Sequence, residues 1–288
     1  MSGPPRRLLR QPGPARPERW LAAGGALREL AFTLEPGLTI NAAITGPLRQ
    51  AGITGATVEL AGGALGPFTY VMPGLSTDPR HAAFYSAPYR PEGRTAFERG
   101  VATVGERDGA PFIHCHAAWQ EPEGRRAGHV MPLDTIVREP IRAHAYGTAE
   151  AAFCVLPDAE TNFPLFTPVP SGRTARGRQI LLLKVQPNEP LDGAILAACR
   201  AHGLACASVH GIGSLVVARF ADGRDAPSIA TELFLTEGRV RLEADRQEIA
   251  LAITLVDVDG VIHEGPLAPG NPVCITCELS VVETPPEG

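Results

Sequence analysis

The alternation of apolar and polar residues predicts two stretches of β-structure, each preceded by one short helix. Residues 191–202 place Ile195, Leu196 and Cys199 on one helical face, and Gly203 ends that helix. The β-like runs cover residues 100–104, 112–116 and 135–137 in the first stretch, and 239–242, 249–256 and 273–282 in the second. A single helix followed by strands at hairpin spacing predicts an α+β fold with mostly antiparallel sheets.

The two stretches follow the same order of elements, which indicates two tandem copies of one module, each a sheet with a packed helix. Pro36 and Pro187 are 151 positions apart, and Gly62 and Gly213 have the same separation. We therefore expect a flexible N-terminal tail (1–24), a first domain (25–166), a Pro/Gly/Arg-rich linker (167–178) and a second domain (179–284).

Three histidines in the first copy have the spacing of metal ligands. His114 and His116 are two residues apart on a predicted strand, so their side chains share one face about 7 Å apart. The polar segment 120–126 predicts a hairpin whose return strand would bring His129 beside them. Three imidazoles with an open fourth position are typical of a reactive zinc site. The alternative is three unconnected histidines in a half-buried sheet.

The second copy lacks these ligands. The positions equivalent to the first two histidines hold Ala250 and Ala252, and the equivalent of the third falls near Pro266. We therefore expect one metal ion per chain, bound by the first copy alone.

Both halves resemble the PPC ("plants and prokaryotes conserved") domain. The motifs that carry this resemblance are His114-Cys-His116 followed by Gly128-His129, the bend Val209-His-Gly-Ile-Gly-Ser214 and the acidic turn Asp257-Val-Asp-Gly260. The resemblance implies a compact α+β fold, assembly as a homotrimer, and a metal held by His114, His116 and His129 near a subunit boundary. It also implies a DNA-binding label, since plant members carry AT-hook segments.

Charge and composition argue against several other partners. The net charge of −5 disfavours nucleic acid, because duplex binding depends on cations that displace counterions from phosphates. The nearest string to an AT-hook core is Arg176-Gly-Arg-Gln179, which lacks the final proline. No apolar run reaches the ~20 residues that span a membrane, and the N-terminal sequence lacks a secretory signal pattern. These features predict a cytoplasmic protein.

Segments found only in the first half offer groups that could complete a site. Arg80 could bind a substrate carboxylate, and Tyr85 or His81 could exchange a proton with the substrate; the alternative for each of them is a solvated loop residue. Glu160 is a candidate general base or a partner that orients a metal-bound imidazole, although a turn that caps the domain explains it equally well. The leading hypothesis is a metal-dependent lyase, hydratase or hydrolase acting on a small polar or carboxylate-bearing molecule. The alternatives are a non-catalytic DNA-binding or regulatory protein and a metabolite sensor.

Overall fold

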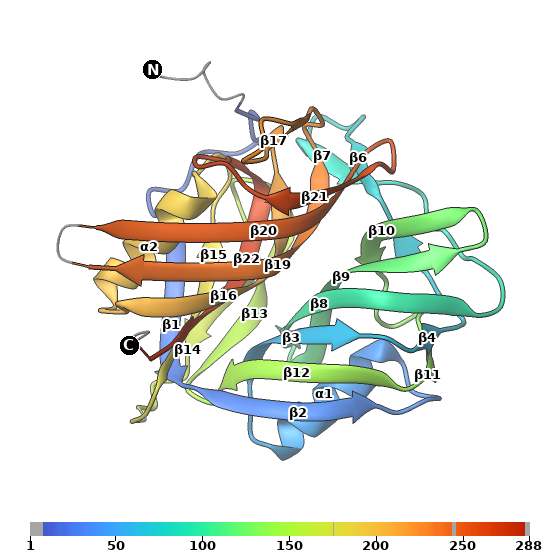
Figure 1. The fold of residues 1–288 in the computed structure, drawn as a ribbon, viewed down its shortest axis with the longest axis horizontal. Helices are drawn as coiled ribbons and strands as arrows, with labels where there is room; N and C mark the ends of the chain where they lie inside the picture. The colour runs from blue at the N-terminus through green and yellow to red at the C-terminus, as the bar shows by residue number, and fades with distance from the viewer. Residues whose placement is uncertain (1–7, 175, 244–245, 286–288) are drawn as a thin grey trace.

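Two large β-sheets and two short helices form most of the computed structural model, which describes residues 8–174, 176–243 and 246–285 (Figure 1). Almost all neighbouring strands are antiparallel, as the sequence predicted; β13 and β8 are a parallel pair. In this part of the chain no helix is long and apolar enough to cross a membrane.

The first sheet has the strand order β2-β12-β3-β8-β9-β10-β5, with four further strands attached to it. Its main strands are β2 (Arg28–Leu34), β12 (Ile141–Thr148), β3 (Gly55–Ala61), β8 (Thr95–Arg107), β9 (Ala110–Glu121), β10 (Gly124–Val130) and β5 (Tyr70–Val71). The attached strands are β4 (Ala64–Leu65), β11 (Val137–Glu139), β13 (Ala151–Pro157) and β14 (Pro164–Pro170). A separate hairpin, β6 (Pro73–Leu75) with β7 (Ala83–Tyr85), follows β5 in the chain.

The second sheet has the strand order β1-β15-β22-β16-β19-β20-β21. Its strands are β1 (Trp20–Ala26), β15 (Gln179–Val185), β22 (Val273–Glu283), β16 (Cys206–Leu215), β19 (Thr231–Leu242), β20 (Gln247–Asp257) and β21 (Ile262–Pro266). Strands β17 (Ala218–Arg219) and β18 (Asp225–Ala226) form a small hairpin of their own.

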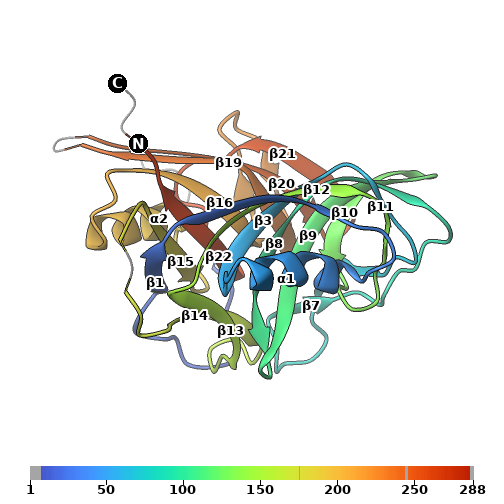
Figure 2. The ribbon, with the colours of Figure 1, turned by 90° about the horizontal axis from the view of Figure 1, so that it is seen from below.

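The two helices, α1 (Ile40–Gln50) and α2 (Leu191–Ala201), are 151 positions apart at both ends. The Thr39 hydroxyl accepts a hydrogen bond from the amide of Ala42 and so caps the start of α1. Helix α1 lies against the first sheet and α2 against the second (Figure 2). Each helix contributes its buried apolar face to a separate core. Helix α1 contributes Ile40, Ile44 and Leu48, and helix α2 contributes Leu191, Ile195 and Cys199.

The strand ladders align the two sheets residue by residue. The pair Ala56–Val104 in the first sheet corresponds to the pair Ala207–Val240 in the second. The pairs that β8 makes with the first two histidines, Thr103–His114 and Val101–His116, correspond to Arg239–Ala250 and Glu237–Ala252. The pair His129–His116 corresponds to Pro266–Ala252. Ala250, Ala252 and Pro266 therefore stand where the first sheet has its three histidines.

The two sheets pack directly against each other. Ile212, Phe234 and Val256 of the second sheet belong to the same buried core as the first sheet. Burying an apolar side chain of this size contributes roughly 1.5–3 kcal/mol relative to leaving it exposed. A buried hydrogen bond of 2.8 Å between the hydroxyls of Thr57 and Ser280 also joins the two sheets. Side chains from both sheets can therefore meet in one site.

Two regions that were expected to be a tail and a linker contain paired strands. Strand β1 lies within the region expected to be tail and first domain, yet it pairs along its whole length with β15 and covers that edge of the second sheet. The amide of Leu9 donates to Asn188, and Gln11 donates to the carbonyl of Cys274, so the described part of the tail is also attached. Strand β14 occupies the start of the expected linker and pairs with β13.

Candidate metal centre

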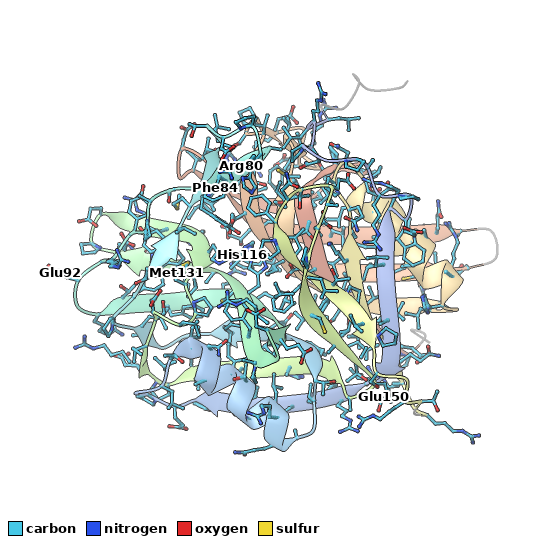
Figure 3. All side chains as sticks on the ribbon, turned by 180° about the vertical axis from the view of Figure 1, so that it is seen from behind. Arg80, Phe84, Glu92, His116, Met131 and Glu150 are labelled. Atoms are coloured by element: carbon cyan, nitrogen blue, oxygen red, sulfur yellow. The ribbon has the colours of Figure 1, made fainter. Side chains whose placement is uncertain are left out.

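The antiparallel hairpin of β9 and β10 brings the three predicted histidines together. His116 and His129 are direct partners in the ladder, and His114 lies two residues from His116 on the same face. One ring nitrogen from each histidine lies within 4.8 Å of the others, and the two Nε2 atoms of His114 and His116 are 3.0 Å apart. Figure 3 shows His116 in the interior of the molecule. The hairpin thus forms a cluster of three imidazoles that can hold a metal ion.

Two contacts from the second sheet orient the imidazoles. Nδ1 of His116 donates to the backbone carbonyl of Leu233 at 2.8 Å, so the lone pair of the neutral ring lies on Nε2. Nδ1 of His114 lies 2.9 Å from a carboxylate oxygen of Glu278, which selects the same tautomer. Hydrogen bonds of this kind fix the ring orientation of metal-binding histidines and make the ligating nitrogen more basic.

Glu232 on β19 is a further candidate ligand that was not predicted from the sequence. Its Oε2 atom lies 2.7 Å from Nε2 of His116 and 3.9 Å from Nδ1 of His129, and the residue is 7% exposed. A sequence signal existed, since a carboxylate in the apolar run 231–235 is almost never fully buried without a partner. The same reasoning applies to Glu278.

The donor atoms in this cluster fit a divalent cation. Among the described residues, Oε2 of Glu232 and Nδ1 of His129 are buried without a hydrogen-bond partner. With the proton of each neutral ring on Nδ1, the Nε2 atoms of His114 and His116 and the carboxylate of Glu232 meet without a proton between them, and an unpaired buried polar group costs roughly 1–3 kcal/mol. The separations of 2.7, 3.0 and 3.9 Å bracket the edge of about 3.3 Å expected for a tetrahedron with zinc–ligand bonds of 2.0–2.1 Å.

The electrostatics of the cluster follow from burial and from the two carboxylates. Burial, together with the neighbouring His114 and His116, holds the pKa of His129 well below its usual value, so this ring is neutral. Burial also opposes the charging of His114, but Glu278 and Glu232 outweigh it and raise the pKa of that ring. Burial and the same carboxylates raise the pKa of Tyr85 well above its usual value, so its hydroxyl keeps its proton.

A cavity of about 210 Å³ adjoins the three histidines. Its lining includes the polar residues Glu232, Glu278, Ser214 and Thr276 and three aromatic residues, Phe84, Phe163 and Phe166, which are called its aromatic wall below. Tyr85 also lines it, with its ring centre 5.1 Å from that of His129. The structure therefore places Tyr85 beside the metal cluster, where it can reach a bound molecule.

Arg80 does not line this cavity. Its guanidinium binds the carboxylate of Asp78 at 2.8 Å, and its side chain is 78% exposed. The hydrogen bond from Arg80 lowers the pKa of Asp78 to about 2. Arg80 therefore lies outside the lining of this cavity, and its charge is paired with a carboxylate two residues away.

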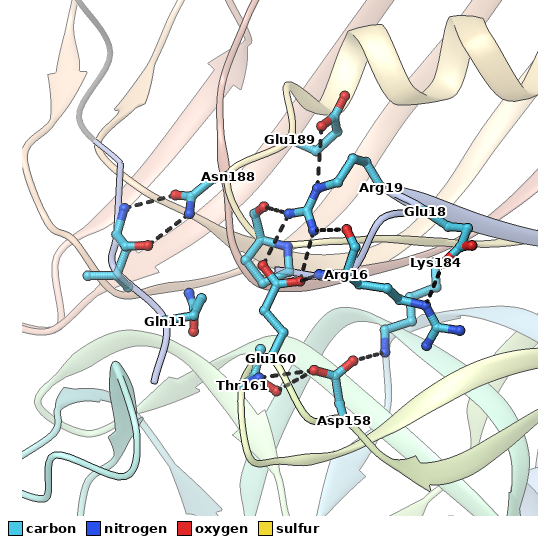
Figure 4. A network of polar contacts seen from close by, with 12 residues as sticks. Gln11, Arg16, Glu18, Arg19, Asp158, Glu160, Thr161, Lys184, Asn188 and Glu189 are labelled. Atoms are coloured by element: carbon cyan, nitrogen blue, oxygen red, sulfur yellow. Dashed lines mark hydrogen bonds and ion pairs between the residues drawn. The ribbon is translucent and has the colours of Figure 1, made fainter. Parts of the chain in front are cut away.

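Glu160 likewise lies outside the residues that line the cavity. Its carboxylate pairs with the guanidinium of Arg19 at 2.8 Å and accepts a hydrogen bond from the amide of Arg16 at 2.9 Å (Figure 4). These contacts attach the N-terminal segment to the turn at 158–162. Such contacts are those expected if Glu160 belongs to a turn that caps the domain, and not those of a general base in the cavity.

Several solved structures are similar in fold to about half of this chain. No protein-family model matches the sequence, and no curated protein matches it. A PPC protein from Pyrococcus horikoshii is 16% identical, with a TM-score of 0.40, over 52% of this chain and 96% of that chain. A metal-containing protein from Archaeoglobus fulgidus is 17% identical, with a TM-score of 0.38, over 48% and 92%. A hypothetical protein from Salmonella enterica is 17% identical, with a TM-score of 0.38, over 51% and 96%.

Proposed function

We propose that the chain consists of two copies of one PPC-like module, and that the first copy binds one divalent metal ion, with zinc as the best-suited ion, next to a small-molecule cavity. The observation that carries this proposal is the buried cluster of three imidazoles with the carboxylate of Glu232. Imidazole and carboxylate ligands in a near-tetrahedral arrangement suit zinc. The second copy lacks the histidines and instead contributes Glu232 and Glu278 to the site of the first.

We further propose that this site belongs to a metal-dependent enzyme of the lyase, hydratase or hydrolase class. A bound divalent ion polarises a carbonyl or lowers the pKa of a bound water. The residues of the chain have separate tasks: the Leu233 carbonyl and Glu278 hold two imidazoles in place, and Tyr85 offers a protonated hydroxyl at the cavity wall. Phe84, Phe163 and Phe166 add apolar surface to the lining of the same cavity.

Elemental analysis of the purified full chain tests the metal site. We expect one zinc ion per chain in the wild type and less than a tenth of that in His116→Ala, because the variant loses the central imidazole of the cluster. The matched control is His202→Ala, an exposed histidine at the end of α2, which should keep the metal. Equal metal content in the wild type and in His116→Ala would overturn the proposal.

A further inference from the structure

We infer that the cavity takes an uncharged small molecule with an apolar body and an amide or carbonyl head, in preference to a carboxylate-bearing molecule. This inference rests on the proposed metal site and narrows its substrate class. Three features of the cavity carry it: the charges of its lining, a hydroxyl in that lining without a hydrogen-bond partner among the described residues, and its aromatic wall.

The charges of the lining disfavour an anion. Glu232 and Glu278 both line the cavity, and no arginine or lysine is found among its described lining residues. The single lysine of the chain, Lys184, is bound to Asp158 at 2.8 Å, and Arg80 is bound to Asp78. The two carboxylates together balance a divalent ion. A further carboxylate would bring an uncompensated negative charge into a buried site, which is costly.

Thr276 offers an uncharged polar contact to a molecule in the cavity. The residue is 4% exposed and lines the cavity, and its hydroxyl has no hydrogen-bond partner among the residues that the structure describes. A buried polar group without a partner calls for a ligand or a water molecule. Because a hydroxyl both donates and accepts, it can bind either the oxygen or the N–H of an amide head.

The aromatic wall suits the apolar body of such a molecule. The rings of Phe84 and Phe163 stack with centres 5.8 Å apart and planes at 25° to each other, and Phe166 is buried. Phe84 is 47% exposed, so a bound apolar group would cover it and gain roughly 25 cal/mol for each Å² removed from water. The volume of about 210 Å³ is several times the ~30 Å³ that a water molecule occupies, but below the range of drug-sized pockets.

Benzamide and benzoate test the inference, because they share size and shape and differ in charge. Isothermal titration or ligand-observed NMR on the zinc-loaded full chain should show benzamide binding at least about tenfold more tightly than benzoate. Thr276→Val should weaken benzamide binding roughly two- to twelvefold, the equivalent of one net hydrogen bond of 0.5–1.5 kcal/mol. Thr33→Val, on an exposed position of β2, should leave it unchanged.

Benzoate binding at least as tight as benzamide binding would overturn the inference. The failure of both compounds to bind at about 10 mM would also overturn it, since this concentration exceeds the Kd of ~1 mM that corresponds to a binding free energy of −4.1 kcal/mol. An unchanged affinity in Thr276→Val would remove the role of that hydroxyl. Elemental analysis of the same samples separates this inference from the proposed function. A metal-free chain would overturn the metal site, yet it should still prefer benzamide, because the two carboxylates remain.

Discussion

The carboxylate of Glu232 in the second sheet lies 2.7 Å from Nε2 of His116 in the first sheet. The same imidazole donates through Nδ1 to the carbonyl of Leu233, the next residue along β19. One strand of the second sheet thus contacts both nitrogens of the central histidine. The metal cluster is therefore built by both sheets, although its three imidazoles come from one hairpin.

Replacement of Glu232 by glutamine should weaken metal binding without removing the imidazoles. The amide keeps the shape of the side chain but loses its charge, and we expect a loss of metal affinity of about 10–100-fold, the range found when groups supporting a metal site are changed. Competition with a chromophoric chelator measures this loss. Glu237→Gln, an exposed position on the same strand, is the control and should retain wild-type affinity. Equal affinities in the two variants would exclude Glu232 from the metal site.

Removal of the metal should lower the thermal stability of the whole chain, because the ion would join ligands from both sheets. A ligand present at 100 times its Kd stabilises the folded state by about 2.7 kcal/mol. At roughly 2–4 °C for each kcal/mol in a chain of this size, chelation should lower the Tm by about 5–10 °C. Differential scanning calorimetry with and without chelator measures the change. If elemental analysis confirms that the metal is lost and the Tm is unchanged, the prediction that the ion joins ligands from both sheets is contradicted.

The ion pair of Asp158 and Lys184 should contribute strongly to folding, because both side chains are almost fully buried and lie 2.8 Å apart (Figure 4). Removing one partner of a buried pair leaves an uncompensated charge and costs about 3–5 kcal/mol. We expect this loss in Asp158→Asn by urea denaturation, and less than about 1 kcal/mol in Asp222→Asn, whose pair with Arg224 is exposed. Similar small losses in both variants would show that the buried pair is dispensable.

The same pair predicts a dependence of stability on pH. Burial opposes ionisation of Asp158, but the hydrogen bond and charge of Lys184 outweigh it and lower the pKa below the usual 3.8. A carboxyl whose pKa is depressed by folding stabilises the folded state above its unfolded pKa and loses that contribution as the pH falls through the folded value. The difference in unfolding free energy between wild type and Asp158→Asn should therefore shrink below about pH 4. A difference that is constant from pH 7 to about pH 3 would show that Asp158 is not ionised in the folded chain.

Local patterns in the sequence were sufficient for much of the fold. Helix α2 begins at the predicted Leu191 and ends one residue before the predicted end, because apolar periodicity and a following glycine are local signals. The N-terminal segment could not be placed in this way. Strand β1 belongs to the second sheet because its partner β15, more than 150 residues away, offers an open edge, and nothing within residues 20–26 encodes that partner.

The sequence by itself determined the three imidazoles, since strand alternation places His114 and His116 on one face and a short hairpin returns His129 to them. Only the tertiary structure decided the rest of the site. Glu232 and Thr276 reach the cavity because the apolar faces of the two sheets pack together, and that packing depends on the whole buried surface rather than on any short segment. Arg80 lies outside the lining of the cavity, and the structure pairs it with Asp78, a neighbour in the sequence.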